Sequence, residues 1–197
     1  MAGLAARPVV RPGNRRRLAL GLGLAAVLVL ARALWIPAKA LVAQVLLERA
    51  WNESGGASRV RAWPWADSWP VARLRAPRLG IDQIVLANAT GSTLAFAPGH
   101  VDGTAAPGAH GNTVLAGHRD THFAFLERLR AGDELWIDRV DGTKTRYVVR
   151  STTVVDRTRA ELLLPGELDL LTLVTCWPFT AVVPGGRERY VVQAERI

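Results

Sequence analysis

Cysteine is nearly absent from this sequence, occurring once in 197 residues. A single cysteine excludes an intramolecular disulfide framework and any zinc or redox site of the CxxC type. The sequence also lacks internal repeats and low-complexity tracts. Its hydrophobic content of 49% is enough to bury a core, which argues against an intrinsically disordered chain. The 18 glycines and 11 prolines favour short strands and turns over long helices.

Acidic residues are scarce in the first third of the chain. Residues 1–70 hold ten basic and three acidic residues, whereas residues 71–197 hold fifteen and fourteen, so the net charge of +8 sits almost wholly in the first segment. The basic excess therefore lies outside the expected folded domain, and we expect no nucleic-acid partner.

Charges are also missing from most of a 21-residue apolar run, Leu18 to Ala38, which only Arg32 interrupts. Spanning a bilayer takes about 20 apolar residues. We predict a single-pass transmembrane anchor at 18–38 in the cell (inner) membrane. The anchor is preceded by five arginines, Arg7, Arg11, Arg15, Arg16 and Arg17. We therefore predict that residues 1–17 form a cytoplasmic basic tail and that the domain lies on the other side of the membrane. A cleaved signal peptide, with a poor site at Ala38-Lys39-Ala40, and a buried helix are the alternatives.

Residues 39–70 are predicted to be a juxtamembrane helix and linker. Ala40–Trp51 has helical periodicity, and Asn52–Ser58 has the composition of a flexible linker. Trp63, Trp65 and Trp69 follow. They fit an aromatic belt at the membrane or a cap packed on the domain, and the sequence leaves both open.

Residues 71–197 show the pattern of short strands and turns. Seven or eight strands in this length predict a mainly β fold that closes into a barrel and so leaves few exposed edges. Helical pattern is limited to Thr121–Leu129 and Arg159–Leu164. The strand candidates are Val71–Ala76, Leu79–Leu86, Thr113–Gly117, Glu134–Ile137, Thr145–Val155, Leu168–Thr175 and Tyr190–Ala194.

Cys176 ends an apolar strand candidate, LDLLTLVTC, and Trp177-Pro178 follows it. Because proline cannot continue a central strand, the thiol sits where a rigid strand opens into a loop. A small buried hydrophobe is the bland alternative. An unpaired thiol in an exported protein is, however, a candidate nucleophile.

A catalytic thiol needs a nearby base. His118 closes TVLAGH, another strand end, and Asp120 is placed to orient its imidazole or, with Thr121, to cap a helix. His118 and His122 also have the four-residue spacing of zinc motifs, but no third ligand is in view and we expect no metal or other cofactor. His100 and His110 fall in a Gly/Pro-rich loop and are expected to be polar loop residues.

Arg189 begins the last strand candidate, RYVVQA. A guanidinium offers fixed donors for an oxyanion if this strand pairs beside the cysteine strand, and the connection Trp177–Glu188 allows a hairpin. A solvated arginine at a strand edge is the alternative.

Together, TVLAGH with His118, TLVTC with Cys176 and Arg189 before YVVQA resemble the sortase family of membrane-anchored cysteine transpeptidases. The run PGHVDGTAAPGAHGNTVLAGHRDTHF and the segment WIPAKA are most similar to the proteobacterial type. The resemblance covers residues 71–197 and implies an eight-stranded catalytic barrel. It also implies a peptidase-class (hydrolase) enzyme that cleaves a C-terminal LPxTG-like sorting signal of an exported protein.

The roles that this resemblance implies are specific. Cys176 attacks the scissile carbonyl to form a thioester, His118 moves the proton, and Arg189 stabilises the oxyanion or the substrate. Thr175 and Trp177, which flank the thiol, are expected to contact the substrate. The sequence does not identify the amine acceptor. An L,D-transpeptidase-like envelope enzyme and a non-catalytic anchored binding module remain as alternatives.

Overall fold

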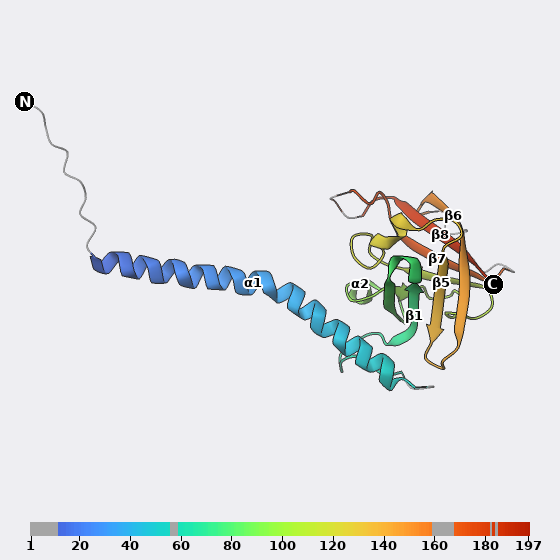
Figure 1. The fold of residues 1–197 in the computed structure, drawn as a ribbon, viewed down its shortest axis with the longest axis horizontal. Coiled ribbons are helices and arrows are strands. Elements are labelled where there is room, and N and C mark those ends of the chain that lie inside the picture. Colours follow the sequence, from blue (N-terminus) through green and yellow to red (C-terminus); the bar gives the residue numbers. More distant parts are fainter. Residues whose placement is uncertain (1–11, 56–58, 159–167, 182, 184) are drawn as a thin grey trace, which may run out of the picture. The chain divides into compact units, whose positions relative to one another are not determined.

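The computed structural model describes residues 12–55, 59–158, 168–181, 183 and 185–197. The chain divides into two compact units, Met1–Val42 and Ala43–Ile197. The helix α1 (Pro12–Glu53) is the first element and crosses the boundary between the units (Figure 1).

The first unit consists of α1 up to Val42. Its large apolar side chains, from Leu18 to Leu34, are exposed instead of packed against other residues. The helix has one 18-residue window of mean hydropathy 2.1, which is long and apolar enough to cross a membrane by length and composition. This agrees with the anchor expected at 18–38.

The second unit is built on a closed barrel whose strands follow the order β1-β2-β3-β4-β7-β8-β6-β5 (Figure 1). The predicted mainly β barrel is confirmed. Its strands are β1 (Pro70–Ala76), β2 (Ile81–Leu86), β3 (Gly99–His100), β4 (Asn112–Ala116), β5 (Glu134–Arg139), β6 (Lys144–Asp156), β7 (Leu170–Cys176) and β8 (Glu188–Arg196). Most neighbours are antiparallel, but β2 runs parallel to β3 and β4 runs parallel to β7.

Alternation of apolar side chains fills the barrel. In β1 the inward positions are buried and the residues between them are half-buried, the pattern of a strand with one face on the core. Strands β4 and β7 contribute Leu115, Leu171 and Leu173, all fully buried. Phe123, Phe125 and Leu126 close the same core from the segment around the short 3-10 helix η2 (Ala124–Arg128).

Short helices connect several strands. Besides η2, the described residues contain η1 (Pro77–Leu79) and α2 (Gly91–Leu94). The helix expected over Thr121–Leu129 is reduced to η2. Its N-cap is Phe123, so the predicted capping by Asp120 or Thr121 is wrong. The helix expected over Arg159–Leu164 lies outside the described residues.

Within the second unit, the residues Ala43–Glu53 of α1 cover the outside of β2. Leu47 packs with Ile84, Leu86 and Ala97 in a second, smaller apolar cluster. Gln44 Nε2 donates to the Phe96 carbonyl over 2.7 Å. The last turns of α1 are therefore part of the folded domain, and Asn52 and Glu53 are helical instead of belonging to the expected linker.

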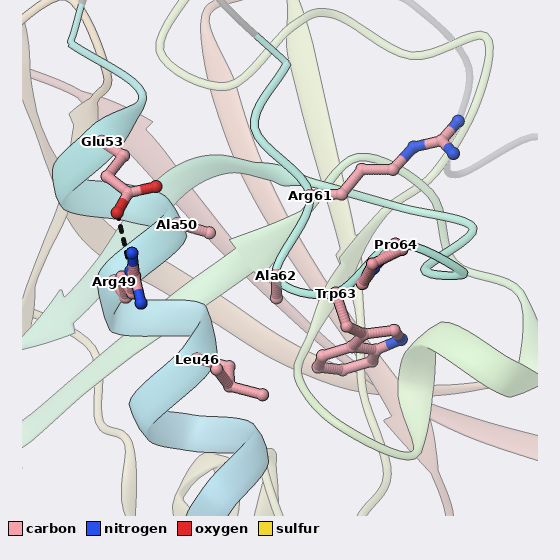
Figure 2. Close-up of a pocket in the computed structure, with 8 residues that line it drawn as sticks. All are labelled: Leu46, Arg49, Ala50, Glu53, Arg61, Ala62, Trp63 and Pro64. Atoms are coloured by element: carbon pink, nitrogen blue, oxygen red, sulfur yellow. Dashed lines mark hydrogen bonds and ion pairs between the residues drawn. The ribbon is translucent and has the colours of Figure 1, made fainter.

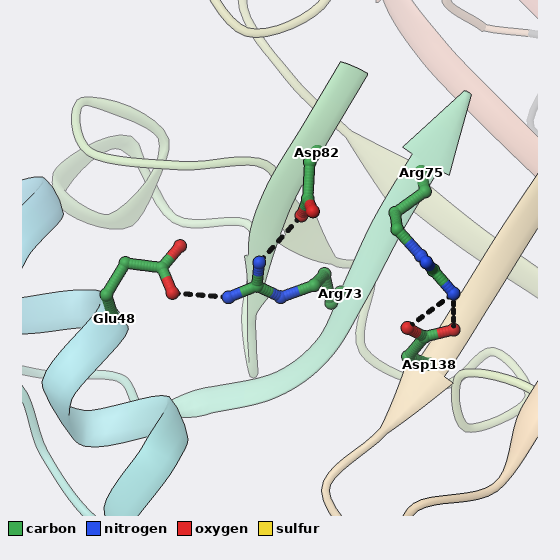
Figure 3. A network of polar contacts seen from close by, with 5 residues as sticks. All are labelled: Glu48, Arg73, Arg75, Asp82 and Asp138. Atoms are coloured by element: carbon green, nitrogen blue, oxygen red, sulfur yellow. Dashed lines mark hydrogen bonds and ion pairs between the residues drawn. The ribbon is translucent and has the colours of Figure 1, made fainter. Parts of the chain in front are cut away.

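An arginine network strengthens this contact (Figure 3). Arg73 of β1 bridges Glu48 of α1 and Asp82 of β2, with the Asp82 contact at 2.8 Å. Two residues further along β1, Arg75 pairs with Asp138 of β5 over 2.7 Å. The Arg73–Glu48 pair joins the helix end to the barrel, and because the Arg73 side chain is only 19% exposed this pair is screened less than a pair between two exposed side chains.

The tryptophan segment fits neither expectation, a membrane belt or a cap packed on the domain, over its whole length. Trp63 packs edge-on against Phe96 with ring centroids 4.9 Å apart, and Arg59 lies over the Trp69 ring at 4.7 Å. Trp65 is 79% exposed. Trp63 therefore packs on the folded domain, Trp69 is half-buried, and Trp65 is exposed enough to meet a membrane surface.

Candidate active site

Cys176 is the last residue of β7 and its side chain is half-buried. Along β7 the residues Leu171 and Leu173 point into the core, so the strand's alternation puts Cys176 on the outer face with Thr172 and Val174. The thiol thus stands at the rim of the barrel and outside its hydrophobic interior.

His118 follows β4 by two residues and is exposed. The parallel register pairs Ala116 with Val174. Gly117 N then donates to the Val174 carbonyl over 3.2 Å. The register ends there, and continuing it by two residues along each chain brings His118 level with Cys176. Neighbouring strands lie about 4.8 Å apart, so we expect the imidazole and the thiol to be neighbours at this rim.

One buried hydrogen bond fixes this alignment. The Thr175 hydroxyl donates to the Gly117 carbonyl over 2.7 Å, which ties the residue before the cysteine to the residue before the histidine. Thr175 is 2% exposed. Its hydroxyl therefore binds the backbone between β4 and β7. The expected contact of Thr175 with a substrate stays a prediction.

Arg189 lies directly opposite Cys176 in the antiparallel pair of β7 and β8. Opposed residues share a face, with Cβ atoms about 4.5–5.5 Å apart. The guanidinium Nη1 donates to the Gly186 carbonyl over 2.7 Å and to the Glu188 carbonyl over 2.9 Å. The expected hairpin from Trp177 to Glu188 is present, and Trp177 N closes it on the Glu188 carbonyl at 3.1 Å.

Aromatic rings brace the connection that leaves Cys176. Trp177 stacks on Tyr190 with centroids 5.5 Å apart, and Phe179 meets Tyr190 edge-on at 5.2 Å. Trp177 is half-buried, so part of its ring remains accessible beside the thiol. Its role as a substrate contact stays a prediction.

A second histidine lies close to His118. Burial lowers the pKa of His122, and the positive charge that His118 can carry lowers it further. Gln83 of β2 holds this segment by donating to the His122 carbonyl over 3.0 Å. A neutral His122 places no competing charge beside His118 near neutral pH.

The other expected polar residues are placed away from this pair. His100 belongs to the strand β3 and not to a loop as expected, and its Nε2 lies 2.9 Å from the Ala105 carbonyl. His110 Nδ1 lies 2.8 Å from Asp169 Oδ2. Asp120 is exposed, and its orienting role toward His118 stays a prediction. No group of three metal-binding side chains occurs among the described residues.

Sequence reasoning missed two residues of this site, and both adjoin His118. Gly117 must be small, because a Cβ there would lie 2.7 Å from the Phe123 ring. Arg119 is 8% exposed, which is unusual for an arginine. The only signal in the sequence was their adjacency to His118. The ring contact depends on how the turn brings Phe123 back onto Gly117, and the partners of Arg119 lie more than 60 residues away.

A separate cavity of about 290 Å³ lies between the end of α1 and residues 61–64. Its lining includes Leu46, Trp63 and the ion pair Arg49–Glu53, while Arg61 points away from it (Figure 2). It contains none of the residues predicted to be catalytic. The residues predicted to be catalytic lie instead at the rim where the ends of β4 and β7 and the start of β8 meet, and their catalytic roles stay a prediction.

Comparison with known proteins agrees with this fold. The Sortase domain family model matches residues 74–197. Sortase D of Bacillus subtilis (strain 168) is 30% identical over 125 residues, which are 63% of this chain and 62% of that protein. A Clostridium perfringens sortase D5 transpeptidase has a TM-score of 0.64 at 25% identity, covering 79% of this chain and 98% of that chain. Sortase C-1 of Actinomyces oris has a TM-score of 0.58 at 29% identity, covering 65% and 74%.

The chain belongs to the sortase family, as the sequence motifs predicted. It spans about 62% of the length of the curated relative from Bacillus subtilis. None of the relatives named above comes from a proteobacterium, so they do not support the predicted similarity to the proteobacterial type.

Proposed function

We propose that this chain is a sortase-type cysteine transpeptidase that cleaves a C-terminal, LPxTG-like sorting signal of an exported protein and joins the new carboxyl end to an amine. The observation that carries the proposal is the alignment of His118, Cys176 and Arg189 on one face, at the adjoining ends of three neighbouring strands. Similarity to a protein named as a sortase D5 transpeptidase supports it.

The first half-reaction forms an acyl-enzyme. The Cys176 thiolate attacks the scissile carbonyl carbon, and the carbon–nitrogen bond then breaks to leave a thioester on Sγ. The leaving amine takes a proton from the His118 imidazolium, so charge and protons balance. His118 is exposed and Cys176 is half-buried, so a peptide can approach both side chains from solvent.

The second half-reaction reverses these roles. Neutral His118 accepts a proton from the incoming amine, which attacks the thioester and releases the Cys176 thiolate. Water attacking in place of the amine gives hydrolysis, the reaction of the peptidase class. The amine is identified only by its chemistry, as a nucleophile small enough to reach the rim.

Arg189 supplies the donors for the negative charge that develops on the carbonyl oxygen. Within the described part of the chain, its hydrogen bonds to Gly186 and Glu188 use Nη1 alone. Nε and Nη2 therefore stay available for the oxyanion, while the two backbone carbonyls hold the guanidinium plane in place.

The anchor helix places this reaction at a membrane. We infer that residues 1–17 are cytoplasmic and that residues 71–197 face the other side, because the basic residues of the chain's start precede the apolar run. Such an arrangement gives the site access to exported proteins.

The test uses the full-length chain in detergent micelles with a fluorogenic LPxTG peptide and a short glycine peptide as the amine. We expect transpeptidation product, and a thioester on Cys176 that mass spectrometry detects when the amine is left out. Cys176→Ala should abolish both. Turnover that persists in Cys176→Ala would refute the mechanism.

Substitutions at Arg189 and Arg187 distinguish a catalytic role of one arginine from a general effect of positive charge. Arg189→Lys should lower kcat more than it raises KM, by roughly a hundredfold or less, because one oxyanion donor typically contributes about 3 kcal/mol and lysine keeps part of it. Arg187, two residues away, is exposed and pairs only loosely with Asp156 at 3.5 Å. Arg187→Lys should be neutral. Equal, small effects at the two positions would leave the oxyanion without this donor.

A further inference from the structure

Arg119 immediately follows His118, and its burial needs an explanation. It is 8% exposed and is the only charged side chain among the buried residues of the described chain. Burying a guanidinium is unfavourable unless it is paired and hydrogen-bonded. No carboxylate of the described residues forms an ion pair with it, so its partners are of another kind.

Those partners are backbone carbonyls of the connection between β7 and β8. Arg119 Nη2 donates to the Ala181 carbonyl over 2.5 Å and to the Val183 carbonyl over 3.1 Å. This connection begins at Cys176 and ends at Arg189. One side chain therefore links the backbone that carries the histidine to the loop that joins the other two site residues.

The second terminal nitrogen of Arg119 is buried as well. Nη1 has no hydrogen-bond partner within the described part of the chain. A buried donor without a partner lowers the stability of the fold. Arg73 Nε is also buried without a partner, so this property alone does not distinguish the two arginines. What distinguishes Arg119 is that its donors bind the connection between β7 and β8, next to the predicted site.

We propose that Arg119 is a positioning residue that sets the distance between His118 and the Cys176–Arg189 hairpin by clamping the connection 177–187. This inference rests on the proposed function. Charge-assisted hydrogen bonds from a rigid guanidinium fix two carbonyls of the loop at once. Proton transfer between a histidine and a thiol-bound intermediate tolerates little misplacement, and an error of 1 Å can lower a rate about a hundredfold.

The experiment compares Arg119→Met with Arg73→Met in the full-length chain in detergent micelles. Methionine keeps much of the length and apolar volume of the arginine stem and removes the donors. Arg73 is the matched control, because it is also a shielded arginine with polar partners but binds Glu48 and Asp82, away from the site. We measure thermal unfolding, kcat and KM for the LPxTG peptide, iodoacetamide alkylation of Cys176, and amide hydrogen exchange.

For Arg119→Met we expect kcat to fall about ten- to a hundredfold at a temperature where the protein is folded, with KM changed by less than about threefold. Exchange should accelerate in residues 177–187 and stay unchanged in β1 and β5. Arg119→Lys should recover part of kcat, because an ammonium can still donate to a carbonyl. Arg73→Met should lower the unfolding temperature and leave kcat and loop exchange unchanged.

The clamp is overturned if Arg119→Met keeps wild-type kcat, or if its exchange rises equally in all strands, as a general loss of stability would produce. Failure of the unaltered chain to process any sorting peptide would instead refute the proposed function. In that case the amide hydrogen exchange of residues 177–187 and the alkylation rate of Cys176 still test whether Arg119 holds the connection. Unchanged values of both in Arg119→Met would overturn this proposal.

Discussion

A methyl group added at Gly117 would collide with the Phe123 ring, next to the predicted proton-transfer residue. The added Cβ would lie 2.7 Å from Cγ, 2.9 Å from Cδ2 and 3.0 Å from Cδ1 of that ring. Carbon atoms pack at about 3.5–4.0 Å, so the ring or the strand end must move by about 1 Å. Phe123 is fully buried in the core and has little room to retreat.

From this overlap we expect Gly117→Ala to destabilise the protein by about 1–3 kcal/mol. Gly117 is not among the glycines with positive φ, so the loss is steric and involves no backbone strain. For a domain of this size each kcal/mol lowers the unfolding temperature by about 2–4 °C. Because His118 follows directly, a shift of about 1 Å should also lower kcat by up to roughly a hundredfold.

The assay is a double-mutant cycle that combines Gly117→Ala with Phe123→Leu. Urea denaturation of the full-length chain in micelles gives the free energy of unfolding of each variant. Leucine removes part of the ring that the methyl group meets, so the double variant should be more stable than the two separate losses predict, by about 0.5–3 kcal/mol. Gly91→Ala is the control, since a Cβ at Gly91 meets nothing within 4 Å. Additive losses in the cycle, or a Gly117→Ala variant as stable as Gly91→Ala, would refute the reasoning.

Three further predictions concern alignment, pH and topology. Thr175→Val should destabilise by about 1–3 kcal/mol, since the buried Gly117 carbonyl loses its 2.7 Å donor, and an unchanged urea midpoint would contradict this. The hydrogen bonds from Arg78 hold the pKa of Asp133 below its ordinary value, so this carboxylate stabilises the fold above about pH 4 and ceases to as the pH falls through the lowered pKa. Asp133→Asn should therefore lower the unfolding temperature at pH 7, and the gap from the unaltered chain should narrow near pH 2. Alkaline phosphatase fused after Ile197 should be active, and activity of a cytoplasm-only reporter there would contradict the proposed orientation.

The strands were predictable because their side chains alternate. Val71–Ala76 has small apolar residues at every second position, and the structure buries Ala72, Leu74 and Ala76 in the core. The catalytic candidates were predictable for a related reason, since a proline after Cys176 and a turn after His118 mark strand ends. Sequence order alone could suggest that two strand ends meet, and the parallel register of β4 and β7 shows that these two do.

Local pattern failed where distant residues decide the outcome. The two-residue strand β3 exists because Gly99 and His100 pair with β4 and Gly99 also pairs with β2, and two residues are too few to show a periodicity. Asn52 and Glu53 have linker composition, yet the packing of Leu47 on the barrel supports α1 to its end. Arg119 has the sequence neighbourhood of a surface residue, and only the β7–β8 connection buries it.

The same register that fills the core also assembles the site. Leu115 pairs with Leu173 on the inner face, and this pairing places the positions three residues further on, His118 and Cys176, on the outer face. A slip of one residue in either strand would move its whole apolar set to the other face, so a barrel with a misaligned site would also have a misaligned core. Hydrophobic packing therefore selects the alignment that the proposed chemistry needs, and the Thr175–Gly117 hydrogen bond supports it at the rim, where the apolar pairs end.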